Sequence, residues 1–210
     1  MKGILITFEG IDGAGKTTQW NKLATYLKGW GYPVETIREP GGNAVSEKIR
    51  DLLLDVHNEG IRPMTEAFLY AAARAQLVEE VLKPLLAKGT IVLADRFTDS
   101  TIAYQGYGRG MDIDLLGQLN RLATGGLKPD LTILLDLDVT EAVKRMQWNA
   151  PDRMESQGAA FRQKVREGYL ALAAGNERIV VIDANQPEAE VSRQIYDKVV
   201  TFLKGLQANG

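Results

Sequence analysis

The chain of 210 residues contains no cysteine and a single histidine, His57. Without cysteine it can form no disulfide, and the lack of cysteine together with one histidine argues against a zinc site or a nucleophilic catalytic triad. His57 lies in a polar stretch, and we expect no functional role for it. A chain without cysteine fits a reducing compartment, so we predict a cytoplasmic protein.

Long apolar runs and blocks of basic residues are also missing from the sequence. The apolar runs are far too short to span a bilayer, and a strand pattern begins within four residues of Met1, so we expect neither a membrane span nor a signal peptide. The formal net charge is −2. Polymeric nucleic acid and membrane surfaces are therefore not expected as partners.

Short apolar segments alternate with longer helical patterns along the chain. The strand candidates are rich in Val, Ile and Leu without polar alternation, as in strands that are covered on both faces: Ile4–Phe8, Val34–Arg38, Thr90–Ala94, Leu131–Leu137 and Ile179–Ile182. The helical candidates are Thr17–Trp30, Ser46–Leu54, Thr65–Ala87, Ile113–Thr124, Val139–Met146, Phe161–Ala174 and Glu188–Leu206. This order predicts one α/β domain, with a parallel sheet of about five strands and helices on both faces.

Residues 10–17 read Gly-Ile-Asp-Gly-Ala-Gly-Lys-Thr, which is a complete phosphate-binding loop between a strand and a helix. The glycines let backbone N–H groups surround a phosphate, and the following helix points its positive end at the same anion. Lys16 would reach the outer phosphates, and the Thr17 hydroxyl would ligate Mg²⁺. The predicted nucleotide-phosphate site comprises Gly10, Ile11, Asp12, Gly13, Ala14, Gly15, Lys16, Thr17 and Thr18.

Further polar residues follow the next strands, and ligands gather at the carboxyl ends of the strands in such sheets. Arg38 and Glu39 follow the second strand, and Asp95 and Arg96 follow the third. Arginines and acids beside a phosphate loop suit two phosphorylated ligands that meet over one Mg²⁺, with Asp95 in the metal shell.

No evident general base accompanies these groups. Phosphorylating a hydroxyl calls for a residue that manages its proton. A phosphate monoester needs none, because its oxygen is already largely anionic above a second pKa of about 6. The pattern therefore favours nucleoside monophosphate kinase chemistry.

Over nearly its whole length the chain resembles the thymidylate kinase family, whose members convert dTMP to dTDP with ATP. The resemblance rests on several spaced motifs: Phe8–Thr18, Arg38–Gly42, Tyr70-x-x-x-Arg74, Asp95-Arg96-x-x-x-Ser100-x-x-x-Tyr104-Gln105-Gly106, Pro129–Thr132 and Asp152-Arg153-x-Glu155. It implies ATP and dTMP as ligands, Mg²⁺ as cofactor and a homodimer.

The resemblance also implies a dTMP site, made of Asp12, Arg38, Glu39, Tyr70, Arg74, Arg96, Ser100, Thr101, Tyr104 and Gln105. Asp12 would contact the 3′-hydroxyl, and Arg38 and Arg96 would hold the 5′-phosphate. The Tyr70 ring, where the family usually has Phe, would stack on thymine, and Arg74 would bind its O4. Ser100, Thr101 and Gln105 would read the base edge, and Tyr104 would crowd the 2′ position.

Some members of the family carry a basic residue at the position of Gly13, whereas others supply an arginine from a lid. This chain resembles the second type, so we expect a lid over residues 144–158 that delivers Arg153 or Arg145. Arg153 is the leading candidate for the catalytic set, with Lys16, Asp12 and Arg96, and Arg145 would belong to the ATP site.

Plainer interpretations of these motifs remain open. Tyr70 would be a core residue, Asp99 or Ser100 would cap a helix, and the residues from Asp152 to Glu155 would form a surface charge cluster. The rival functions are a deoxynucleoside kinase, with Glu9 or Glu39 as base, and a nucleotide-dependent switch protein.

Overall fold

The computed structural model describes residues 3–146 and 152–208. Five strands within these residues form a fully parallel sheet in the order β2-β3-β1-β4-β5. They are β1 (Ile4–Glu9), β2 (Val34–Arg38), β3 (Ile91–Asp95), β4 (Leu131–Asp136) and β5 (Ile179–Asp183). Every predicted strand is present, which confirms the α/β class, although the third begins and ends one residue later than predicted.

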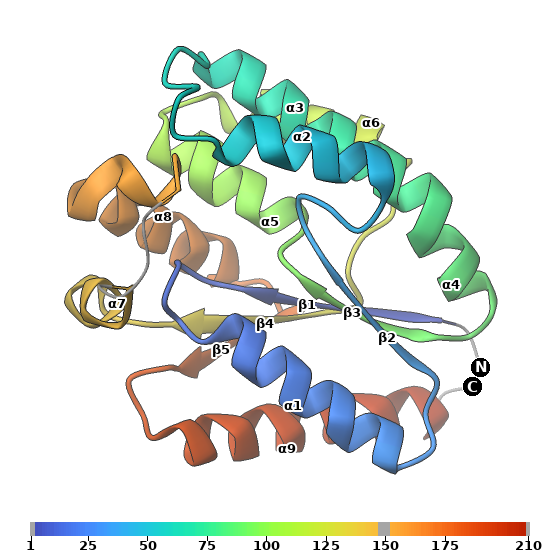
Figure 1. Ribbon diagram of the computed structural model, residues 1–210. Coiled ribbons are helices and arrows are strands. Elements are labelled where there is room, and N and C mark those ends of the chain that lie inside the picture. Colours follow the sequence, from blue (N-terminus) through green and yellow to red (C-terminus); the bar gives the residue numbers. More distant parts are fainter. Residues whose placement is uncertain (1–2, 147–151, 209–210) are drawn as a thin grey trace.

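Helices cover both faces of the sheet. The α-helices are α1 (Lys16–Gly29), α2 (Ala44–Leu54), α3 (Pro63–Leu77), α4 (Lys83–Ala87), α5 (Thr98–Thr101), α6 (Ile113–Thr124), α7 (Val139–Met146), α8 (Gly158–Ala173) and α9 (Glu188–Ala208). In Figure 1, α1 and α9 lie on one face, while α2 to α6 and α8 lie on the other. Among the described residues, no helix is both long and apolar enough to cross a membrane.

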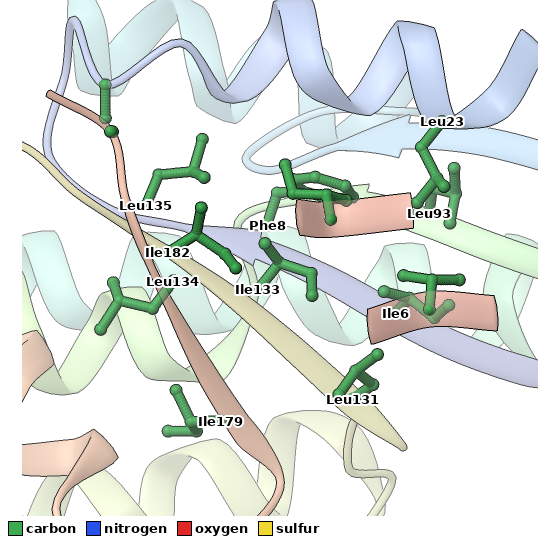
Figure 2. Packing of buried hydrophobic residues seen from close by; sticks show 14 of the residues in the cluster. Ile6, Phe8, Leu23, Leu93, Leu131, Ile133, Leu134, Leu135, Ile179 and Ile182 are labelled. Carbon is green, nitrogen blue, oxygen red and sulfur yellow. The ribbon is translucent and has the colours of Figure 1, made fainter. Parts of the chain in front are cut away.

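The main core packs the strands of the sheet against α1 and α9 on one face and extends to α8 on the other. Every residue of β1 is buried, because this strand has a neighbour on each side and helices on both faces. Figure 2 shows Phe8 and Ile6 of β1 beside Ile133 of β4, with Leu23 of α1 directed toward Leu93 of β3. The phosphate loop follows the carboxyl end of β1, so it is anchored to a fully buried central strand.

The helix predicted over Thr65–Ala87 is interrupted. A π-helical turn, η1 (Val78–Leu82), separates α3 from α4, and Pro84 lies in the first turn of α4. Proline lacks an N–H group and its ring clashes with the carbonyl four residues earlier, so the wider turn accommodates it. α3 also begins earlier than predicted, at Pro63, where a proline suits the first helical position.

Residues 98–108 are helical, which the sequence suggested only as a plainer alternative. α5 continues into a second π-helical segment, η2 (Ile102–Gly108). The suggested caps are wrong: the helix starts after Phe97, and both Asp99 and Ser100 lie inside it, where Asp99 pairs with Arg178. The predicted lid falls partly on residues 147–151, outside the described residues, and continues in a short 3-10 helix, η3 (Glu155–Gln157).

Leu23→Ala should lower the free energy of unfolding by about 2–5 kcal/mol, because Leu23 is fully buried and the smaller side chain leaves a cavity between α1 and the sheet. Leu206→Ala on α9 is the matched control, since Leu206 is 45% exposed and should change stability by less than about 0.5 kcal/mol. Urea denaturation of both variants measures the difference. Equal losses in the two would contradict this placement of the core.

Candidate functional site

A cavity of about 740 Å³ opens at the carboxyl ends of the strands. Most of the predicted site residues line it: Asp12, Gly13, Ala14, Gly15, Lys16, Thr17, Thr18, Arg38, Glu39, Tyr70, Arg74, Asp95, Arg96, Ser100, Thr101, Tyr104, Gln105 and Arg145. Gly10, Ile11 and Arg153 are not in the lining. Asp152 and Glu155 also line it, so the fold brings residues from five of the six sequence motifs to one hollow.

Gly15 of the phosphate loop has a left-handed backbone (φ 89°) and caps α1, which begins at the next residue. Glycine adopts this conformation without steric cost, and the helix then starts with its N–H groups facing the cavity. The Lys16 Nζ atom donates to the carbonyl oxygens of Gly10 and Ile11, at 3.1 Å each. The ammonium group is thus held over the loop, where an outer phosphate would lie.

Gly13 has no room for a side chain. Its φ is +83°, and a Cβ atom there would lie 2.9 Å from the carbonyl oxygen of Ala142 in α7. Close packing of α7 on the loop therefore excludes a basic side chain at this position. Any additional cation near the transferred phosphate has to come from another element.

The predicted metal ligands Thr17 and Asp95 lie together, since the Thr17 hydroxyl donates to Asp95 Oδ2 at 3.0 Å. A hydroxyl and a carboxylate are hard oxygen donors of the kind that Mg²⁺ prefers. Within residues 3–146 and 152–208, no group of three or more acidic, His or Cys side chains could hold a metal. A Mg²⁺ ion at this place would therefore take most of its ligands from phosphate oxygens and water.

Arg96 follows β3 with a positive φ of 73°, a conformation that is costly for a residue with a side chain. Its backbone N–H donates to Phe8 O at 3.0 Å, which keeps the chain against β1. Its guanidinium donates to Gly10 O (3.0 Å), Asp12 Oδ1 (2.5 Å) and the Tyr104 hydroxyl (2.8 Å). The strained turn thereby directs the side chain back over the phosphate loop.

Asp12 is held as an anion by this arrangement. Burial opposes its ionisation, but the positive charges of Arg96 and Lys16 and a hydrogen bond from Tyr104 hold the pKa of Asp12 well below its usual value. Burial and the neighbouring charge of Arg96 in turn lower the pKa of Lys16. The site thus concentrates two cations around one carboxylate at the loop, which favours an anionic ligand.

Glu9 lies beneath the cavity and not in its lining. Its side chain is fully buried and accepts from the Phe97 N–H (2.8 Å), the Ser100 hydroxyl (2.6 Å) and the Tyr169 hydroxyl (2.8 Å). Burial, and then the negative charge of Asp99, raise the pKa of Glu9 to about 7. Glu9 therefore positions the start of α5, and it is too deep to act as the general base that a deoxynucleoside kinase would need.

Arg74 is almost completely buried and satisfied by protein groups. Nε donates to Glu39 Oε2 (2.8 Å), Nη1 donates to Thr101 Oγ1 (2.8 Å) and Asn120 Oδ1 (2.7 Å), and Nη2 donates to Phe97 O (3.1 Å). Burial raises the pKa of Glu39, whose Oε1 has no hydrogen-bond partner among the described residues. Arg74 therefore shapes one end of the cavity wall and leaves Glu39 Oε1 as a free polar atom there.

Arg50 of α2 lines the cavity but was missed by sequence reasoning. Arg50 Nη1 donates to Pro40 O at 3.0 Å, and Arg38 Nη1 donates to the same carbonyl at 3.2 Å. Burial, and then the positive charge of Arg38, lower the pKa of Arg50. The sequence of α2 gives no sign that Arg50 is a site residue, because only the packing of α2 brings its side chain next to Arg38.

The two candidate lid arginines have different surroundings. Arg145 of α7 lines the cavity, and its Nη2 donates to Ala184 O at 3.2 Å. Arg153 is 5% exposed, its Nε donates to Leu53 O at 2.6 Å, and its Nη1 lies 2.7 Å from Glu66 Oε2. The structure thus turns Arg153 toward Glu66, whereas Arg145 lies in the lining of the same cavity as the phosphate loop.

Known proteins share this architecture along nearly the entire chain. The thymidylate kinase family model matches residues 8–195. The thymidylate kinase of Caldanaerobacter subterraneus subsp. tengcongensis is 48% identical over 206 residues, covering 98% of this chain and 99% of that protein. The thymidylate kinase of Geotalea daltonii is also 48% identical, over 212 residues, with 97% and 99% covered.

A solved structure agrees with the sequence relatives. The crystal structure of thymidylate kinase from Ehrlichia chaffeensis superposes with a TM-score of 0.77 at 36% identity, covering 95% of this chain and 99% of that chain. A family match over most of the chain, relatives of equal length and a solved structure of the same fold all agree with the phosphate loop and the arginine-lined cavity, so the chain belongs to the thymidylate kinase family.

Proposed function

We propose that this kinase transfers the terminal phosphoryl group of ATP to the 5′-phosphate of dTMP, with Mg²⁺, and forms dTDP through the residues of this cavity. The observation that carries the proposal is that one hollow of about 740 Å³ contains a phosphate loop and, beside it, the arginines Arg38, Arg50 and Arg96. Such a site holds two phosphorylated ligands close together, and approximation of reactants is a large part of phosphoryl-transfer catalysis.

On the donor side, the loop N–H groups and Lys16 would bind the β- and γ-phosphates of ATP. Thr17 and Asp95 would hold the Mg²⁺ ion, which neutralises charge on the phosphates when it is bound. Arg145 is the arginine best placed to stabilise the transferred group, since it lies on α7, the helix that packs on the loop at Gly13.

On the acceptor side, Arg96 and Arg38 would hold the phosphate of dTMP. Asp12 keeps the Arg96 guanidinium over the loop and would contact the 3′-hydroxyl. Tyr70 would stack on thymine, and burial raises the pKa of Tyr70, so its ring stays neutral. Tyr104 would face the sugar, since its hydroxyl lies between Arg96 and Asp12.

The remaining residues of the predicted dTMP site would surround the edge of the base. Arg74 and Glu39 form the buried end of the cavity wall, and Ser100, Thr101 and Gln105 line it nearby. No general base is needed on the acceptor, because the attacking oxygen belongs to a phosphate that is already anionic.

We further propose a homodimer and a cytoplasmic location. The homodimer rests on the family resemblance and is supported by exposed apolar side chains on the neighbouring helices α2, α3 and α6, among them Leu52, Phe68 and Leu122. Light scattering on the purified protein tests the assembly. The cytoplasmic location rests on the absence of cysteine.

The reaction itself is tested with ATP, Mg²⁺ and a panel of acceptors, namely dTMP, dUMP, dCMP, dGMP and thymidine, by following ADP release. We expect turnover to be highest with dTMP and to stop when EDTA removes the metal. Faster turnover of thymidine than of dTMP would overturn the proposal in favour of a deoxynucleoside kinase. Turnover that no monophosphate stimulates would overturn it in favour of a switch protein.

Arg96→Lys should raise the KM for dTMP and lower kcat, each by about tenfold or more, because lysine keeps the charge but loses the planar fork that binds phosphate and Asp12 together. The KM for ATP should change little. Steady-state kinetics and calorimetry of dTMP binding measure both effects. Unchanged dTMP affinity would show that Arg96 does not hold the acceptor phosphate.

Tyr104→Ala should narrow the preference for dTMP over its ribonucleotide counterpart, because loss of the ring opens space for a 2′-hydroxyl. Tyr104→Phe is the control, since it keeps the ring and removes only the hydroxyl that contacts Arg96 and Asp12. The ratio of kcat/KM for the two nucleotides should fall in the alanine variant and persist in the phenylalanine variant. A ratio that is unchanged in both would exclude steric selection by this ring.

Arg145→Met should slow phosphoryl transfer by about 10- to 1000-fold at saturating ATP and dTMP, if its charge meets the developing charge on the transferred group. Arg153→Met should retain most of the wild-type rate under the same conditions, because Arg153 is engaged by Glu66. Single-turnover dTDP formation compares the two. The opposite ranking would assign the catalytic charge to Arg153.

A further inference from the structure

Glu66 is a buried carboxylate that the proposed reaction does not use. It lies on α3, one helical turn before Tyr70, and its side chain has no exposed surface. Oε1 accepts from Gln105 Nε2 (3.0 Å) and Arg109 Nε (3.2 Å). Oε2 accepts from Arg109 Nη2 (3.0 Å) and pairs with Arg153 Nη1 (2.7 Å). One carboxylate thus joins three side chains that are far apart in the sequence.

Two of these side chains hold residues 152–157, which we call the 152–157 segment. Arg109 Nη1 donates to Gln157 Oε1 at 2.6 Å, and the same guanidinium lies 4.9 Å from the Phe161 ring centre. The Arg153 side chain attaches the segment to the end of α2, because its Nε donates to Leu53 O at 2.6 Å, next to the bond from its backbone N–H to Leu54 O at 3.0 Å.

The 152–157 segment forms part of the cavity wall through Asp152, Met154 and Glu155. The third donor to Glu66, Gln105, lies in the same wall. Glu66 therefore contacts the cavity wall directly through Gln105. It contacts the wall indirectly through Arg109 and Arg153, which hold the 152–157 segment.

The charges explain why Glu66 controls this region. Burial opposes its ionisation, but hydrogen bonds from Arg109 and Gln105 and the charge of Arg109 lower the pKa of Glu66, so it stays anionic. Two guanidinium groups then share one carboxylate. If the negative charge were lost, Arg109 and Arg153 would face each other without a counter-ion, and a buried unpaired charge is strongly destabilising locally.

We propose that Glu66 is a positioning residue for the base-binding part of the cavity: it fixes the Gln105 side chain and, through Arg109 and Arg153, holds the 152–157 segment against that part. The inference rests on the proposed function. It gives Arg153 a role in placing the wall around the nucleobase, separate from charge stabilisation at the transferred phosphate.

The test compares Glu66→Gln, Arg153→Met, Arg153→Lys and the double variant of Glu66→Gln with Arg153→Met. Glutamine keeps the shape of Glu66 and removes its charge. We expect both the Glu66→Gln and the Arg153→Met variant to raise the KM for dTMP by about tenfold to a hundredfold, the range for loss of a charge-assisted hydrogen bond. The kcat and the KM for ATP should change by less than about threefold, because the donor site is untouched.

Coupling between the residues gives a readout that a general loss of stability would not produce. If Glu66 acts through Arg153, the KM for dTMP in the double variant should stay close to that of the worse single variant, well below the product of the two losses. Arg153→Lys should recover part of the loss, since an ammonium can pair with Glu66 but cannot also reach Leu53 O in the same way.

Arg166→Met is the matched control, because Arg166 of α8 also loses an ion pair with carboxylates, at Asp136 and Asp138, outside the cavity lining. Its KM for dTMP should remain within about twofold of wild type. An equal rise in this control, or independent, multiplying losses in the double variant, would overturn the inference. If the Glu66→Gln protein does not fold by circular dichroism, the two Arg153 variants decide, and a wild-type KM for dTMP in Arg153→Met overturns it.

The two proposals fail differently in these assays. A wild-type protein that does not phosphorylate dTMP overturns the proposed function and this inference with it. A wild-type protein that is active on dTMP, with an unchanged KM for dTMP in Glu66→Gln, overturns the inference alone.

Discussion

The ion pair between Arg96 and Asp12 joins the end of β3 to the phosphate loop, and the rest of the site is arranged around it. It requires the left-handed backbone at Arg96, which the surrounding contacts to Gly10 O and Tyr104 maintain. Beneath it, buried Glu9 accepts the first N–H after this turn, at Phe97. A strained residue that is fixed from both sides is pre-organised, so a bound phosphate would find its guanidinium already in place.

Four arginines in and around the cavity form two pairs that differ in how their charges are balanced. Arg74 and Arg153 are buried against the carboxylates Glu39 and Glu66 and serve as parts of the wall. Arg38 and Arg50 share one backbone carbonyl, at Pro40, and of the two only Arg38 has an ion-pair partner among the described residues, Glu47 at 3.1 Å, so excess positive charge remains at the cavity. A phosphorylated ligand would supply the missing negative charge, which is why the second group belongs to binding and the first to shape.

Much of the fold was predictable because its signals are local. The five strands are short, apolar and separated by helical patterns, and the structure confirms each of them. The main errors lie where tertiary contacts or a proline overrode the local helix pattern. Pro84 introduces a π-helical turn into a helix that periodicity alone predicts as continuous, and Asp99 and Ser100 bond to distant partners instead of capping a helix.

The sequence by itself determined the class of the fold, the phosphate loop and the family, because each depends on residues at fixed short spacings. Only the tertiary structure decided the partners of Arg153, Arg50 and Arg74. Arg153 meets Glu66 and Leu53 O, and Arg74 meets Asn120, through the packing of helices that are remote in the chain. An arginine side chain is long enough to reach many acceptors, so its spacing in the sequence does not fix its partner. The packing of α2, α3 and η2 determines which acceptor each arginine reaches.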